Sequence, residues 1–445
     1  MIATVQRTAR LLAAHWPALV AWFLAGTLGH YLVLKLAALV GARSALGGIL
    51  LLPVAALMLL IAYVAMLLVL RDGMPKLRSV APLPDGRAER RTAFLDGVLG
   101  GILPFMAFYA AWGFLREDVV DYINGAFVWQ FAWGLEAVVN GVEYDTSGTI
   151  DDLGVNAGTV VILVAAFLAR WAYQRYRARL PKAVGVVAVY LEGLWVYLAA
   201  YVLADLLGSL SGWVQSRQAM VWLGELRAGL VGTLAPLGFL WDGVEWLLGE
   251  AGGLILLPVA WLTIAGVVYG QAVKADAPRL SGDVVERMRT RYATVPQRVR
   301  RRLGDFWGQL TGRFRPIGRA LTIMWRAGPV LIAGYVLLFT VVTLGEQWLT
   351  IGLSRLIGPH ELMSFWVPAS VALTMVVALV VEPVRMAVVA STYDHTLGRL
   401  MSSADVEAHV DETVGSAEGE LDDEGSAGVS GEQDGVGEVV GDGRL

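Results

Sequence analysis

The residue with the clearest chemical potential in this sequence is Glu192, a carboxylate inside an apolar run. Only twelve uncharged residues separate it from Asp205, too few to cross a bilayer, so a span here must include one of the two carboxylates. A charge at membrane depth costs about 2.5 to 3.5 kcal/mol on insertion scales and is usually neutralised or paired. Glu192 is therefore either a proton- or cation-handling group facing a cavity, or a structural carboxyl that bonds a neighbouring helix or lies near the inner interface.

Three other charged residues are candidate partners of Glu192. Arg170 lies in the preceding apolar run, and Glu382 and Arg385 lie near the end of the last one. Because residues three apart share one face of a helix, Glu382 and Arg385 are expected to meet each other. The sequence does not choose between these partners.

Other kinds of chemistry find no support in the residue types and their spacing. The chain has no cysteine, which excludes disulfides, thiolate nucleophiles and cysteine-ligated metals. Its five histidines occur singly, without the spacing of a helical zinc site, and no phosphate-cradling loop or nucleophile elbow is present. We therefore predict no catalytic residues, no metal site and no cofactor, and expect that the protein is not an enzyme.

The surrounding sequence has the composition of a bilayer protein. The chain of 445 residues is 56% hydrophobic and 17% charged, with a mean hydropathy of +0.58. A helix needs about 20 apolar residues to cross the hydrocarbon layer. Runs of that kind predict an all-α polytopic membrane domain over residues 1–401, with about eight spans in four hairpins. Their approximate bounds are 16–34, 49–70, 98–115, 155–173, 184–204, 253–273, 327–344 and 365–388.

The distribution of basic residues predicts the orientation of these spans. Twenty-eight of the 35 Lys and Arg residues lie in the termini and alternate connections on one side, and only six lie in the connections on the other side. Basic residues near span ends resist translocation, so both termini are expected to be cytoplasmic. Arginine outnumbers lysine 31 to 4, which together with the many Ala, Gly and Val residues indicates a GC-rich bacterial genome. The predicted location is the bacterial cytoplasmic membrane.

Two further apolar segments, 123–139 and 228–241, fall in the predicted outer connections. If only one of them crossed, every later basic connection would move outside, against the charge bias. We expect both to lie in the interface or to re-enter, and the aromatic residues of the first favour an interfacial helix. If both crossed, the span count would be ten and the termini would stay inside.

Similar sequences recur at the start of successive hairpins and suggest an internal repeat. Proline opens comparable stretches at Pro53, Pro258 and Pro368, within the second spans of three hairpins. One interpretation is four parallel copies of a unit related by an axis along the membrane normal. The other is that membrane sequences rich in Ala, Leu and Val resemble one another without duplication.

Residues 282–319 form the clearest amphipathic pattern, with apolar residues spaced by three or four and arginines between them. Such a helix is expected to lie on the anionic lipids of the inner leaflet, at about 1 kcal/mol per basic residue near the surface. Because the flanking spans tether it to the membrane, we do not expect nucleic-acid binding, and protein partners are not indicated. The residues expected to contact lipid are Arg287, Arg289, Arg291, Arg298, Arg300, Arg301 and Arg302.

The composition changes after Met401. Residues 402–445 contain thirteen carboxylates, nine glycines, one arginine and no aromatic residue, so they cannot bury enough apolar surface to fold. This acidic tail is predicted to be disordered. It either folds back on the arginine-rich segment and loosens it from lipid, or is simply solvated.

Three classes of function are compatible with these features. The first is a transporter or channel for an ion or small molecule that uses a buried carboxylate. The alternative is a non-enzymatic assembly or scaffold protein that binds lipid or protein partners. The least favoured is a membrane-embedded lipid-modifying enzyme that uses outer carboxylates such as Asp151 and Asp152, a pair more typical of a solvated turn.

Overall fold

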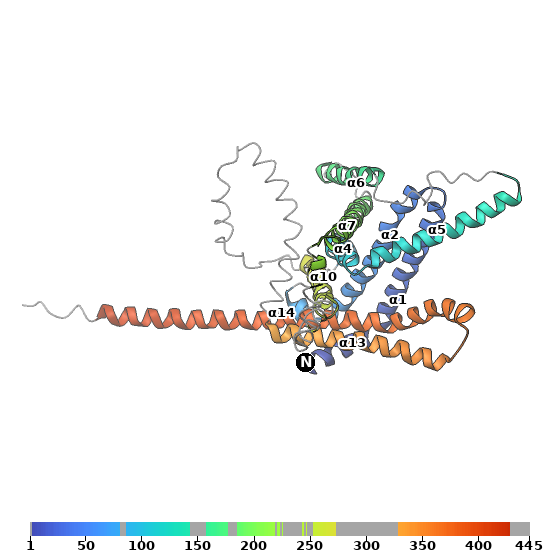
Figure 1. The fold of residues 1–445 in the computed structure, drawn as a ribbon. Helices are drawn as coiled ribbons and strands as arrows, with labels where there is room; N and C mark the ends of the chain where they lie inside the picture. Colours follow the sequence, from blue (N-terminus) through green and yellow to red (C-terminus); the bar gives the residue numbers. More distant parts are fainter. Residues whose placement is uncertain are drawn as a thin grey trace, which may run out of the picture. The chain divides into compact units, whose positions relative to one another are not determined.

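The computed structural model describes residues 2–80, 86–142, 157–176, 185–218, 220–222, 252–272 and 328–427, with isolated positions at 225, 243 and 246. Every regular element in these ranges is helical, as predicted from the long apolar runs (Figure 1). The elements are α1 (Ile2–Gly41), α2 (Ala45–Arg71), α3 (Pro75–Val80), α4 (Arg87–Ala111), α5 (Phe114–Val139), α6 (Ala157–Tyr176), α7 (Gly185–Gln215), η4 (Gly252–Leu256), α10 (Leu257–Ala272), α13 (Pro329–Ile357), η5 (Leu362–Trp366) and α14 (Val367–Ala427).

Six helices in the described part of the chain are long and apolar enough to cross a membrane. They correspond to α1, α2, α4, α7, α13 and the segment formed by η5 and the first part of α14. This confirms an all-α membrane class. The predicted spans at 155–173 and 253–273 coincide with shorter apolar helices, Val160–Tyr173 and Leu254–Gly270. Since a crossing needs about 20 residues, the count of eight stays a prediction.

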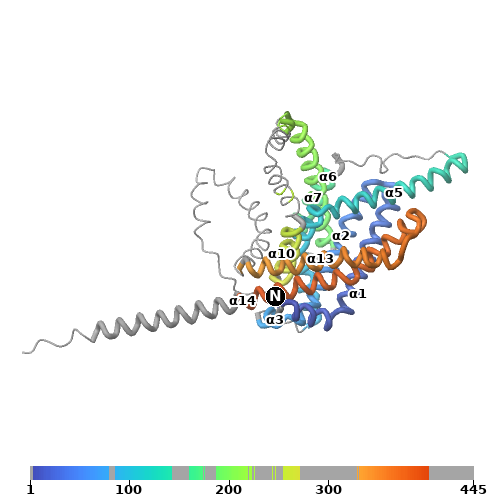
Figure 2. The backbone as a smooth tube through the Cα atoms, turned by 60° about the horizontal axis from the view of Figure 1, so that its bottom comes forward, coloured from blue at the N-terminus to red at the C-terminus, as the bar shows by residue number. Residues whose placement is uncertain are grey.

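Helix α2 lies at the centre of the packing. It contacts α1, α4, α5, α7 and α10, and 61% of its most apolar window is buried, against 11% for α13. Ser44 caps its start by accepting a hydrogen bond from the Gly47 N–H at 3.3 Å. Figures 1 and 2 both show α1 and α2 side by side as a hairpin.

The order of packing differs from a row of sequential hairpins. Helix α6 packs against α7, and α10 packs against α4. Among the described residues, the third predicted span (98–115, in α4) therefore does not pack mainly against the fourth (155–173, in α6). Nor does the fifth (184–204, in α7) pack mainly against the sixth (253–273, in α10). A fourfold repeat stays a prediction.

Helix α5 contains the first of the two extra apolar segments. A turn at Gly113, whose φ is 87°, separates α5 from α4. Tyr122 then fits against Gly41 and Gly48, where an added Cβ would lie only 2.4 Å from its ring, and its hydroxyl donates to the Ala45 carbonyl at 2.9 Å. Burial raises the pKa of Tyr122 to about 12, so the hydroxyl remains a donor.

The C-terminal half of α5 has several exposed apolar side chains, among them Phe131 and Val138, each 75% exposed. An interfacial position for 123–139 agrees with this exposure and stays a prediction. The second extra segment, 228–241, lies outside the described residues.

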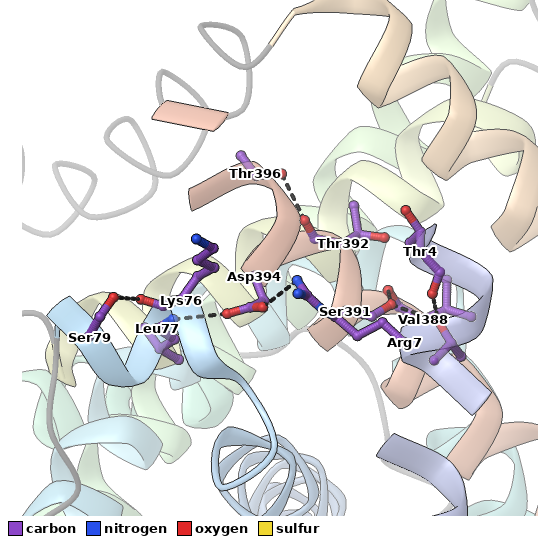
Figure 3. A network of polar contacts seen from close by, with 11 residues as sticks. Thr4, Arg7, Lys76, Leu77, Ser79, Val388, Ser391, Thr392, Asp394 and Thr396 are labelled. Carbon is purple, nitrogen blue, oxygen red and sulfur yellow. Dashed lines mark hydrogen bonds and ion pairs between the residues drawn. The ribbon is translucent and has the colours of Figure 1, made fainter. Parts of the chain in front are cut away.

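A polar clasp joins the start of α1, the start of α3 and the last packed turns of α14 (Figure 3). Asp394 is fully buried and accepts hydrogen bonds from Arg7 Nη1 at 2.6 Å and from the Leu77 N–H at 2.9 Å. The hydroxyls of Thr8 and Ser391 lie 2.7 Å apart beside it. The beginning of the first apolar helix thus meets the end of the last one.

Contacts divide the chain into two compact units, Met1–Thr396 and Leu397–Leu445. Helix α14 continues through Ala427, whereas the acidic tail was predicted to lack regular structure from residue 402. That prediction weighed only the burial of apolar side chains, and Ala and Glu in this stretch have high intrinsic helix propensity. Residues 428–445 and the basic segment 282–319 lie outside the described residues, so the predictions for them stay predictions.

Candidate functional site

Buried charges between apolar helices form the candidate sites of this protein. A charge at membrane depth is stable only when it is paired, protonated or in contact with water, so such groups often have a function. Besides the Arg7–Asp394 pair and the buried Arg71, three groups of this kind lie between helices in the described residues, and two of them contain the residues singled out in the sequence.

The first group is an ion pair between α6 and α7. Arg170 Nε donates to Glu192 Oε2, and the two side chains are 9% and 13% exposed. The guanidinium carbon lies 5.1 Å from the Trp195 ring centre and 6.0 Å from that of Phe167. The Trp195 side chain also lies beside the Glu192 carboxyl group. Of the candidate partners, Arg170 is therefore the one that the structure places at Glu192, and the resulting pair is neutral.

The second group contains the other predicted pair and one further carboxylate. Arg385 Nη1 donates to Glu382 Oε1 within α14, as the spacing of three predicted. Arg385 Nη2 donates to Glu346 Oε2 of α13 at 2.6 Å. The Phe339 ring of α13 lies 5.6 Å from the guanidinium carbon. One guanidinium thus binds two carboxylates.

The sequence analysis missed Glu346 because the seventh span was predicted to end at residue 344. The structure continues α13 to Ile357, which brings Glu346 into the helix instead of an outer connection. A signal was available, since the sequence after Glu346 returns to apolar residues before Arg355.

The charges of this second group do not balance. With both carboxylates ionised, Glu346, Glu382 and Arg385 carry one net negative charge. Glu382 is only 8% exposed, and its Oε2 has no hydrogen-bond partner that satisfies normal geometry among the described residues. The Tyr63 hydroxyl of α2 is the one donor within reach of the same carboxyl group besides Arg385 among the described residues, and the Trp261 ring lies 4.7 Å from the Tyr63 ring. An ionised Glu382 would therefore share one guanidinium with Glu346 and have a phenol as its other donor, which is costly at a buried site.

The third group, which the sequence analysis did not single out, connects α1, α4 and α5. His30 Nε2 lies 3.2 Å from Asp118 Oδ1, and the Tyr109 hydroxyl donates to Asp118 Oδ2 at 2.7 Å. Asp118 is 4% exposed. His30 and Asp118 are far apart in sequence and lie on different helices, so no spacing rule could have paired them.

The structure keeps these groups separate. Arg170 and Glu192 bind each other, while Glu382 and Arg385 bind Glu346. No set of three or more His, Asp or Glu side chains among the described residues is arranged to hold a metal ion. The predicted lipid-binding arginines from Arg287 to Arg302 lie outside the described part of the chain.

Comparisons with known proteins give no identification. No protein-family model, curated protein or solved structure matches this chain.

Proposed function

We propose that this membrane protein is a transporter of protons or small cations, and that Glu382 is the carboxylate that binds the transported ion. The observation that supports this proposal is the unbalanced group on α13 and α14, in which two carboxylates share one guanidinium and the buried Glu382 has no cation of its own. The proposal keeps the predicted class of function and assigns it to a different carboxylate from Glu192.

The difference between the two carboxylates is their charge balance. Arg170 neutralises Glu192 completely, so an additional proton or cation there would have to break an ion pair in a low-dielectric environment. At the second group, Arg385 remains paired with Glu346 whether Glu382 is loaded or empty. Loading Glu382 removes an excess charge, and unloading it restores one. A transport cycle requires such a change in charge at a single site.

Flux measurements in liposomes test this assignment. Purified protein is reconstituted with a pH-sensitive dye inside, and proton and monovalent-cation fluxes are followed under an imposed gradient. Glu382→Gln is expected to abolish the flux, because the amide keeps the shape of the side chain but takes up no proton near neutral pH and carries no negative charge to balance a cation.

Glu361→Gln is the matched control. Glu361 is exposed and bonded to Ser364, so this variant should retain the wild-type flux. If the wild type carries no flux under any gradient, or if Glu382→Gln carries as much as the wild type, the proposal is wrong.

The alternative, an assembly role, is compatible with the exposure of two helices. Only 11% of the most apolar windows of α13 and of α14 is buried within the chain. Helices so little covered must contact lipid or the helices of another protein. Cross-linking in native membranes, followed by mass measurement, distinguishes the two occupants: assembly predicts defined larger complexes, whereas lipid contact predicts the monomer mass. The enzyme alternative gains no support, because Asp151 and Asp152 lie outside the described residues.

We further propose that both termini face the cytoplasm of a bacterial cell. The contact between Arg7 and Asp394 supports termini on one side, and the basic residues favour the inner side. Protease accessibility in sealed right-side-out and inside-out vesicles tests this. Cleavage near Arg90 should occur only in inside-out vesicles, and cleavage in both kinds of vesicle would contradict the orientation.

The segment 282–319 is proposed to bind anionic lipid. Purified protein should bind vesicles that contain phosphatidylglycerol more strongly than vesicles of phosphatidylcholine alone, and salt should weaken that binding. Replacing the seven arginines from Arg287 to Arg302 by glutamine should remove the difference.

A further inference from the structure

The group formed by His30, Asp118 and Tyr109 is not used by the proposed transport site. Asp118 belongs to α5, His30 to α1 and Tyr109 to α4, so their contacts join α5 to two helices of the bundle. Asp118 is buried, while its neighbours Arg116 and Glu117 are exposed and leave it without a cation from its own helix. His30 is therefore the group placed to give Asp118 a positively charged neighbour.

The surroundings of His30 suit a doubly protonated ring. An imidazolium has two N–H donors, whereas a neutral imidazole has one. The Asp118 carboxylate lies at Nε2. The other ring nitrogen, Nδ1, is buried without a hydrogen-bond partner of normal geometry among the described residues, and the acceptor in its surroundings is the Ala55 carbonyl of α2. Both neighbours are acceptors.

The other groups that face this pair do not supply a positive charge. Asp121 of α5 acts on His30, and the hydroxyls of Tyr109 and of Tyr197 on α7 face Asp118. A neutral His30 can still donate its one N–H to Asp118, but it leaves the ionised, buried carboxylate without a counter-charge, which is unfavourable. One proton on the pair removes this cost.

Loss of that proton would weaken the attachment of the N-terminal half of α5, which contains Asp118. The N-terminal half is also held by the Tyr122 hydrogen bond to Ala45, which does not depend on His30. The C-terminal half carries exposed apolar side chains. Protonation would therefore control how firmly α5 is held, and not whether it folds.

We propose that His30 and Asp118 form a proton-binding site, and that the proton bound there holds α5 against α1 and α4. The site takes up one proton from water. When the proton leaves, the ion pair is lost and α5 loosens from the bundle.

Hydrogen–deuterium exchange of the whole protein in lipid nanodiscs tests this inference. The exchange of residues 114–126 in α5 is divided by that of residues 55–67 in α2 at each pH, which cancels the intrinsic effect of pH on exchange. Loss of a charged hydrogen bond should raise this ratio about tenfold between about pH 5 and about pH 9. In the variant His30→Gln/Asp118→Asn, which keeps the side-chain shapes without charges, the ratio should not change with pH.

Two single variants serve as controls, and a third takes the place of the double variant if that one does not fold. His15→Gln alters a histidine of the same helix that bonds only locally, to the Leu11 carbonyl at 3.0 Å, and should keep the rise in the ratio. Glu382→Gln should keep it as well, which separates this inference from the transport proposal. Asp118→Asn alone should remove the rise if the double variant does not fold.

A constant ratio in the wild type would overturn the inference, as would an equal rise in the double variant. In either case the group is a structural contact that the proton does not control.

Discussion

The ion pair of Arg170 and Glu192 makes the sharpest test of how buried charges stabilise this protein. Both side chains are nearly enclosed, at 9% and 13% exposure, and the guanidinium also lies 5.1 Å from the Trp195 ring centre. Glu192→Gln leaves a buried cation without its counter-ion. Arg170→Gln leaves a buried carboxylate in the same position.

The expected cost follows from this geometry. Breaking a buried pair by removing one partner costs about 3 to 5 kcal/mol of unfolding free energy. In Glu192→Gln, the cation–π contact with the Trp195 ring offsets part of this cost for the unpaired guanidinium, by about 0.5 to 2 kcal/mol. We expect Glu192→Gln to cost about 3 kcal/mol, and Arg170→Gln about the same. The double variant buries no charge and should cost no more than either single one. The coupling between the two sites should therefore be about 3 kcal/mol.

The measurement is a double-mutant cycle on the free energy of unfolding in lipid bicelles. Glu361→Gln, which alters an exposed carboxylate, is the control and should change stability by less than about 0.5 kcal/mol. If the costs of the two single variants simply add in the double variant, then Arg170 and Glu192 do not stabilise each other, and the reasoning about charge balance at both carboxylate sites fails.

Three further predictions concern the packing and the tail. Asp394→Asn should lower the unfolding free energy by about 2 kcal/mol, because it removes a charged acceptor at a fully buried site, and denaturation in detergent measures this. Gly41→Ala should destabilise by about 1 to 3 kcal/mol, since the new methyl would overlap the Tyr122 ring. In the same assay Gly212→Ala, where nothing lies within 4 Å, should be neutral or slightly stabilising. Truncation after Met401 should tighten binding to anionic vesicles if the acidic tail competes with the basic segment, and equal binding of both forms at all salt concentrations would exclude that competition.

Part of the candidate site was predictable because it depends on a single helix. Glu382 and Arg385 are three residues apart, and helical geometry alone puts them on one face. Their bond required no knowledge of the neighbours. Arg170 was one of several possible partners for Glu192, and only the packing of α6 against α7 selected it.

Other parts required the whole bundle. Glu346 bonds Arg385 across 39 residues of sequence, and its inclusion depended on where α13 ends. The pairing of His30 with Asp118 depends on how α5 packs against α1. Hydropathy describes how far a helix extends in the bilayer, but it does not describe which of its faces meets which neighbour.

The helical class and the approximate places of the six long apolar helices follow from the sequence alone. The cost of an unpaired backbone in lipid leaves a long apolar run little choice but a helix, and the length of the run sets its ends approximately. The tertiary structure decided the partners of the buried charges. A carboxylate gains its cation only when two helices pack at a particular rotation and depth, and that choice depends on the shapes of all the side chains between them.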